Sequence, residues 1–167
     1  MKIVGLIGGM SWTSTELYYR ELNLETQRMT AGRRSLPIVL WSVDFHDHLA
    51  IHEQLGWEGV QEEMIAIGRR LKLAGAELLV MCANTVHRVA DAVQAGTGLP
   101  LLSVVDAVGE SVRSSGLERV GLLGTRHTMG EAFYKDRLHD ACGVRVMVPG
   151  ARSGCCACPR PTAPGAA

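Results

Sequence analysis

The chain opens with Met1-Lys2-Ile3-Val4-Gly5-Leu6-Ile7-Gly8-Gly9, a short apolar run that carries one charge and ends in glycines. A secretory signal needs a longer apolar region and a small-residue cleavage site, so this run is typical of a buried first β-strand. Apolar residues then recur at helical spacing through Thr13–Arg28. Paired glycines allow a tight turn between the two segments. The opening stretch therefore predicts a strand followed directly by a helix.

Strand and helix patterns alternate from there to residue 148. Apolar runs predict strands at Lys2–Gly8, Pro37–Val43, Glu77–Cys82, Leu101–Val104, Arg119–Gly124 and Val144–Val148. Helical spacing predicts helices at Thr13–Arg28, Trp57–Leu73, Thr85–Ala95, Asp106–Ser114 and Thr128–Ala141. Glycines suited to left-handed helix caps follow at Gly75, Gly96, Gly116 and Gly143. Such repeated units predict an α/β fold, a doubly wound, mainly parallel sheet flanked by helices, with functional residues at the carboxyl ends of the strands.

Charge and hydropathy restrict the class of protein. The chain has 167 residues, of which 17 are basic and 17 acidic, so its formal net charge is zero. A neutral chain offers no electrostatic reason to expect nucleic acid or an anionic membrane as partner. The longest apolar runs, such as Leu78–Ala83, are far too short to cross a bilayer. We therefore expect a cytoplasmic protein.

The last residues, 150–167, break the alternation, with no periodicity and no acidic residue. One interpretation is a disordered tail. The favoured one is out-of-frame sequence, because Gly, Ala, Pro, Arg and Cys dominate when GC-rich codons are read in another frame. Three of the five cysteines lie here, as Cys155, Cys156 and Cys158. Their spacing lacks the paired C-x-x-C geometry of a zinc site, so no metal is predicted, and no disulfide framework is suggested.

Two strand ends carry polar groups that suit a ligand site. After the first strand, Ser11 or Thr13 can cap the next helix, whose N-terminus suits a carboxylate or phosphate, although a capped tight turn is the more ordinary interpretation. After the third strand, Cys82 lies beside Asn84-Thr85, where a helix dipole lowers a thiol pKa. The alternative, favoured from these residues alone, is a buried Cys82 with Asn84 as a helix cap.

A polar cluster follows the second predicted strand and comprises Asp44, His46, Asp47, His48 and His52. His48 and His52 are four residues apart and would share a helix face, so a metal site is conceivable. A polar loop with solvated histidines is the favoured interpretation. Trp41 and Trp57 are interpreted as packing residues, and Arg126 as either an anion partner or a solvated loop residue.

Taken together, these motifs resemble aspartate/glutamate racemases, a family of cofactor-independent amino-acid racemases. The resemblance covers residues 1 to about 150 and is carried by Ile3–Trp12, Ser42–Phe45, Ala74–Ala76, Asn84–His87 and Val120–Thr125. It implies two α/β lobes around the substrate, with residues 1–116 as the first lobe, 117–149 as the start of an incomplete second lobe, and 150–167 as the tail.

The resemblance also implies racemisation of an acidic amino acid, with no cofactor. One residue abstracts the α-proton and a partner on the opposite face returns it, usually two thiols. Ser11, Asn84, Thr85 and Thr125 are the residues expected to hold the small-molecule amino-acid substrate, and a homodimer is one expected assembly. Hydantoin racemisation and malonate decarboxylation are alternatives within the same superfamily.

The sequence departs from the family pattern at both proton-transfer positions. The family's first cysteine directly precedes Asn-Thr, where this chain has Ala83, and Cys82 lies one residue earlier. A one-residue slip in extended backbone turns a side chain to the opposite face. The family's second motif, Gly-Cys-Thr-Glu, is absent from the sequence. Cys82 is the remaining candidate for the catalytic residue, and no measurable racemisation is expected. The alternative is that the chain is a non-catalytic fragment that at most binds a small carboxylate.

Overall fold

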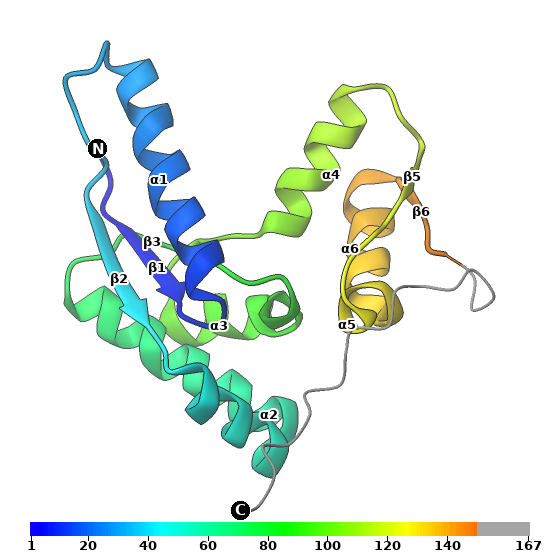
Figure 1. Cartoon of the computed structure of the whole chain (residues 1–167), viewed down its shortest axis with the longest axis horizontal. Coiled ribbons are helices and arrows are strands. Elements are labelled where there is room, and N and C mark those ends of the chain that lie inside the picture. Colours follow the sequence, from blue (N-terminus) through cyan, green and yellow to red (C-terminus); the bar gives the residue numbers. More distant parts are fainter. Residues whose placement is uncertain (150–167) are drawn as a thin grey trace, which may run out of the picture.

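The computed structural model describes residues 1–149, apart from the side chains of Arg126 and His127. The predictions for the tail, residues 150–167, lie outside the described residues. A four-stranded parallel sheet forms the first half of the fold, in the order β2-β1-β3-β4 (Figure 1). Its strands are β1 (Val4–Gly8), β2 (Ile38–Ser42), β3 (Leu78–Met81) and β4 (Leu101–Leu102). The predicted parallel sheet is confirmed.

Helices cover both faces of this sheet, as predicted. Helix α1 (Trp12–Met29) lies on one face, where Tyr18 and Leu22 pack against apolar residues of β1 and β3. Helices α2 (Phe45–Leu73) and α3 (Ala90–Thr97) lie on the other face and complete the larger core. That core lies between the sheet and these two helices. Its buried residues include Ile7, Val60, Met64, Leu71, Leu79, Met81 and Val93. Within the described residues, no helix is long and apolar enough to cross a membrane.

Helix α2 consists of two helical parts separated by Gly56, whose backbone is not helical. The part after Gly56 matches the predicted helix Trp57–Leu73, whereas the part that begins at Phe45 was not predicted. Asp44 caps it by accepting hydrogen bonds from the backbone N–H groups of His46 (2.8 Å) and Asp47 (3.3 Å). Gly56 then kinks it, with φ 64°. The prediction of a polar loop with solvated histidines is therefore wrong, because the residues from Phe45 up to the break at Gly56 are helical.

Three smaller predictions also need correction. Thr85–Val89 forms a 3₁₀-helix, η1, before α3 begins. Gly96 lies inside α3, and Gly98, with φ 66°, is the left-handed cap instead. Val104 is not the end of a strand but the first residue of helix α4 (Val104–Ser114), because Ser103 accepts a capping hydrogen bond from the Val105 N–H. The caps predicted at Gly75, Gly116 and Gly143 all have positive φ, as expected.

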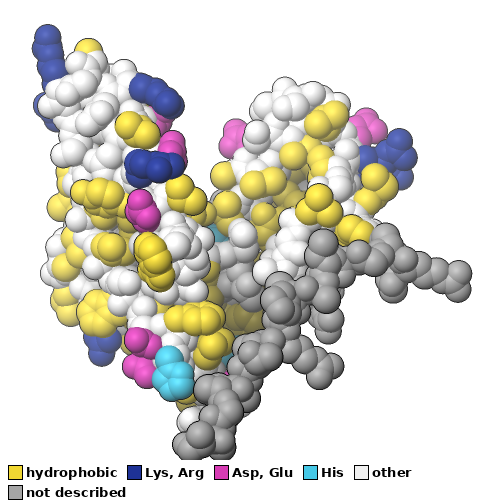
Figure 2. All heavy atoms as spheres, viewed as in Figure 1, with side chains coloured by type: hydrophobic (Ala, Val, Ile, Leu, Met, Phe, Trp, Pro, Cys, Tyr) yellow, Lys and Arg dark blue, Asp and Glu magenta, His cyan; other side chains and the backbone are white. Residues whose placement is uncertain are grey.

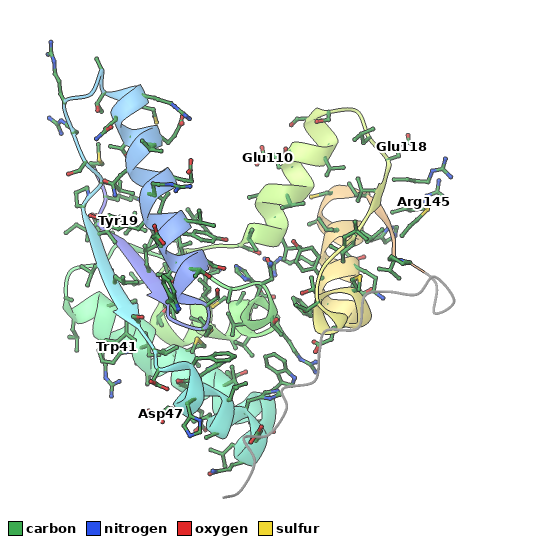
Figure 3. The ribbon with its side chains drawn as sticks, viewed as in Figure 1. Tyr19, Trp41, Asp47, Glu110, Glu118 and Arg145 are labelled. Atoms are coloured by element: carbon green, nitrogen blue, oxygen red, sulfur yellow. The ribbon has the colours of Figure 1, made fainter. Side chains whose placement is uncertain are left out.

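A smaller unit follows the first sheet. Strands β5 (Arg119–Gly121) and β6 (Arg145–Met147) form a parallel pair. They begin side by side, and the Arg145 N–H donates to the Glu118 carbonyl at 2.8 Å (Figure 3). Helices α5 (Arg126–Gly130) and α6 (Ala132–Cys142) lie between the two strands in the chain.

Helix α4 packs with this smaller unit rather than with the first sheet. Its Val105 is fully buried against Tyr134 and Leu138 of α6, and Figure 1 shows α4 beside α6 and well away from α1. From about Ser103 onward, the chain therefore packs within the smaller unit, whereas the sequence predicts a first lobe that extends to residue 116. The division into 1–116 and 117–149 stays a prediction, and the packing favours an earlier boundary.

Ion pairs hold the smaller unit against the first. Arg137 of α6 donates to Asp91 of α3 across the junction at 2.9 Å, and within the smaller unit it also donates to both carboxylate oxygens of Asp106 of α4, at 2.6 and 2.8 Å. This pairing lowers the pKa of Asp106 and raises that of Arg137. Arg88 pairs with Glu131 across the same junction at 2.9 Å. The two units are therefore joined by charge-assisted hydrogen bonds as well as by chain connection.

Large apolar side chains remain exposed along α1. They are Trp12, Leu17, Tyr19, Leu24 and Met29. Figure 2 shows apolar side chains gathered over the part of the molecule where α1 and β2 lie. The homodimer implied by the family resemblance stays a prediction.

Candidate active site

A cavity of about 270 Å³ opens where β1 and β3 end. Its walls come from the start of α2, the junction after β3, and the loop after β5. The lining residues are Met10, Phe45, His48, Leu49, His52, Trp57, Val60, Ala83, Thr85, Val86 and Thr125. They include no Lys, Arg, Asp or Glu. The cavity lies at the carboxyl ends of parallel strands, where doubly wound folds bind their ligands.

Consecutive residues at the end of β3 face opposite sides of the sheet. Cys82 is buried with Val4, Leu6 and Val80 on the α1 face, whereas Ala83 packs on the α2 face and lines the cavity. This alternation follows from extended backbone, in which successive side chains point to opposite faces. The inference that a one-residue slip reverses the direction of the side chain is borne out by these positions.

The environment of Cys82 does not favour a thiolate. The side chain is 1% exposed, and burial raises the pKa of its thiol to about 12. The sequence interpretation of a pKa lowered by a helix N-terminus is therefore wrong, because desolvation of the charged form dominates. The alternative interpretation, a small buried residue at the strand end, matches the observed position. A catalytic role for Cys82 stays a prediction, and it would require the α1 face to open.

Two of the four residues expected to bind substrate line the cavity, namely Thr85 and Thr125. The Thr125 hydroxyl is within hydrogen-bond distance of the Thr128 hydroxyl, at 3.0 Å. Ser11 instead caps α1 and accepts from the Ser14 N–H at 3.4 Å. Asn84 is exposed and makes no capping hydrogen bond through its side chain, so its predicted capping role is wrong. Neither Ser11 nor Asn84 contributes to the cavity wall.

Two histidines predicted to be solvated reach the cavity instead. His48 is 8% exposed, and its Nδ1 lies 2.7 Å from Glu63 Oε2. The His52 ring packs edge-on against Trp57, with centroids 5.0 Å apart. The four-residue spacing of these histidines was the signal for a shared helix face. In the part of the chain that the structure describes, no group of three His, Cys, Asp or Glu side chains could hold a metal ion.

The sequence did not predict that the His87 ring joins two parts of the backbone. Its Nδ1 lies 2.8 Å from the Ala83 carbonyl, and its Nε2 accepts from the Val104 N–H at 3.2 Å. The ring therefore carries its proton on Nδ1 and joins the end of β3 to the first residue of α4. Burial lowers the pKa of His87, although the backbone hydrogen bonds oppose that shift. His87 thus connects the cavity wall to the smaller unit in its neutral form.

We expect His87 to make the protein less stable as pH falls below about 6.5, the ordinary histidine pKa. The folded pKa is lowered, so between the two values the unfolded chain binds more protons and acid favours unfolding. The stability that depends on the neutral ring is fully present above about pH 6.5 and is lost progressively as the pH falls from there through the lowered pKa of folded His87. Urea unfolding of wild type and His87→Gln at pH 7.5 and 5.5 measures it.

The exposed His46 supplies the matched control, since His46→Gln should leave the pH dependence unchanged. The lowered pKa of Asp106 acts in the same direction, but only in the carboxylate range near pH 4 and below. Equal loss of stability in wild type and His87→Gln between the two pH values would contradict the assignment.

Comparison with known proteins identifies the family to which the chain belongs. The family model described as Asp/Glu/Hydantoin racemase matches residues 7–155. The chain belongs to this family. A proposed Asp/Glu racemase from Yersinia pestis is 43% identical with a TM-score of 0.86, over 90% of this chain and 66% of that one. The aspartate racemase homologue PH1733 from Pyrococcus horikoshii OT3 is 36% identical with a TM-score of 0.79, over the same shares.

The fold extends to a more distant relative. The Picrophilus torridus aspartate racemase is 23% identical with a TM-score of 0.68, over 89% of this chain and 63% of that one, and shows the shared fold. The chain spans about two thirds of the length of these relatives. The predicted family and the predicted α/β fold are both confirmed.

Proposed function

We propose that the cavity binds a small acidic amino acid and that it descends from a site for cofactor-independent racemisation at the α-carbon, a reaction that this chain itself does not measurably complete. The observation that carries this proposal is the composition of the cavity walls, which come from the first sheet through Ala83 and Thr85 and from the smaller unit through Thr125. Inversion needs groups that reach the α-carbon from two sides. A site walled by both units supplies that arrangement.

The cavity chemistry suits a small polar ligand. The hydroxyls of Thr85 and Thr125 can hydrogen-bond an amine or carboxylate, and His48 and His52 are the ionisable residues of its wall. Its volume of about 270 Å³ lies just below the range of drug-sized ligand sites, about 300–1,000 Å³. A free amino acid is therefore a better match than a peptide or a nucleotide.

Ala83 limits what this chain does to a bound amino acid. It occupies the position that directly precedes Asn84-Thr85 and lines the cavity, and a methyl group transfers no proton. We propose that the chain binds aspartate or glutamate without measurably interconverting their enantiomers. A function restricted to carboxylate binding is the second candidate, and the same Ala83 side chain favours it.

Binding and inversion are tested separately on the full chain. Titration with L- and D-aspartate and glutamate, followed by NMR shifts, should show binding of at least one of the four. Thr85→Val and Thr125→Val should each weaken that binding about 2- to 10-fold, the loss of one hydrogen bond. Thr13→Val, an exposed threonine outside the cavity, is the matched control.

Chiral chromatography should show no change in enantiomer ratio over days with any of the four amino acids. Absence of binding by all of them would refute the proposed function. Net racemisation would show that a second proton-transfer group is present and that Ala83 does not limit the reaction.

A further inference from the structure

We propose that His48, oriented by Glu63, is the acid–base group of this cavity and exchanges the α-proton of the bound amino acid from the α2 side. The inference rests on the proposed binding of an amino acid. It assigns a function to a pair of residues, one buried and one partly buried, that neither the fold nor the family match explains.

The pair exists because α2 is kinked. His48 and Glu63 are 15 residues apart, on the two helical parts of α2, and a continuous straight helix would rise about 22 Å over that separation. Nδ1 of His48 nevertheless lies 2.7 Å from Oε2 of Glu63. Gly56, with φ 64°, lies between them and turns the first part of α2 back over the second. The kink therefore brings a carboxylate to a histidine that it could not otherwise reach.

The pairing leaves one ring nitrogen available to a ligand. Glu63 occupies Nδ1, and among the described residues Nε2 has no hydrogen-bond partner. His48 is more than nine-tenths buried, yet it lines the cavity. A carboxylate that accepts the Nδ1 proton fixes the tautomer in which Nε2 is a base, and it stabilises the imidazolium that forms after proton transfer.

Among the described residues, the rest of the cavity wall carries no charged side chain that competes with His48 for the ligand. His52 is the other ionisable residue of the wall, and the junction after β3 and the loop after β5 contribute Ala83, Thr85, Val86 and Thr125. His52 packs on Trp57, whose ring also lies 4.8 Å from the Arg88 guanidinium carbon. His48 therefore has a carboxylate partner that His52 lacks.

The proposed step is balanced without a co-reactant. The lone pair of His48 Nε2 takes the α-hydrogen as a proton, and the C–H electron pair stays on the α-carbon and delocalises into the substrate carboxylate. The imidazolium then returns a proton to the same face, and in heavy water it returns a deuteron. Since Ala83 offers nothing on its side, the result is isotope exchange with retained configuration.

The test is α-deuterium incorporation into L- and D-aspartate in heavy water, followed by ¹H NMR on the full chain at saturating ligand. Wild type should exchange one enantiomer faster than the buffer control, with its configuration retained. His48→Gln should reduce exchange to the buffer rate. Glu63→Gln should slow exchange at least tenfold while the dissociation constant changes less than twofold. His46→Gln, on the same helix but exposed, should exchange like wild type.

A spectroscopic measurement separates positioning from folding. The ¹⁵N shifts of the His48 ring should report an Nδ1-protonated tautomer in wild type and a tautomer mixture in Glu63→Gln. Exchange at the buffer rate while the amino acid is bound would overturn the role of His48 and leave the proposed binding intact, whereas absence of binding would refute the proposed function itself. Exchange that survives His48→Gln and is lost in Cys82→Ser would assign the proton transfer to the thiol.

Discussion

Iodoacetamide should modify Cys82 in the folded chain about a thousand-fold more slowly than in the unfolded chain. The reactive species is the thiolate, and burial raises the pKa of Cys82 from 9.0 to about 12. Three pKa units reduce the thiolate fraction at pH 7.5 by about a thousand. The side chain is also 1% exposed, so restricted access lowers the rate further.

Peptide mass spectrometry after timed labelling, in buffer and in 8 M urea, gives the two rates for Cys82 alone. Cys142, which is partly exposed, is an internal reference in the same digest and should be much less protected. A Cys82 that labels within tenfold of its unfolded rate would show that the α1 face opens readily. That outcome would make the thiol available to substrate and restore it as the leading proton-transfer residue.

The strands of the first sheet show how much of the fold could be predicted from the sequence. Strand positions were predictable because β1, β2 and β3 are apolar runs bounded by glycine or polar residues, and their ends moved by only one or two residues. The reversal from Cys82 to Ala83 was also predictable, because it depends on local backbone geometry alone. The part of α2 before Gly56 was not, because its polar and histidine-rich sequence shows no apolar stripe, and the non-helical backbone at Gly56 separates it from the predicted helix at Trp57–Leu73.

The site was only half predictable for a related reason. Thr85 and Thr125 follow strand ends, a position that the sequence marks directly, and both line the cavity. His48 and His87 depend on partners far along the chain, at Glu63 and Val104. A single sequence does not show that a carboxylate 15 residues away folds back onto an imidazole, so solvation was the reasonable but incorrect interpretation for His48.

The turn that supports the cavity should be the most sensitive position in the first sheet. Gly9 has φ +92°, and a Cβ there would lie 2.2 Å from the Val43 carbonyl oxygen and 2.4 Å from its nitrogen. Both neighbours are backbone, so Gly9→Ala forces β1 and β2 apart at their carboxyl ends. A positive φ alone costs about 1–2 kcal/mol for an L-residue, and the backbone clash adds to it. We expect a total loss of about 4 kcal/mol or more, a large part of the 5–15 kcal/mol that stabilises a domain.

Gly32→Ala is the matched control for Gly9→Ala, because Gly32 also has positive φ, at +76°, but its Cβ would meet no atom within 4 Å. It should therefore lose only the conformational cost of about 1–2 kcal/mol. Urea unfolding monitored by circular dichroism gives both values, and the difference between them isolates the contact with Val43. Gly9 also precedes Met10, a residue of the cavity wall, so any folded fraction of Gly9→Ala should bind aspartate more weakly than Gly32→Ala does. Equal stability of the two variants would mean that the end of β2 yields without cost, and the cavity would then lack the rigid backbone on which its proposed chemistry depends.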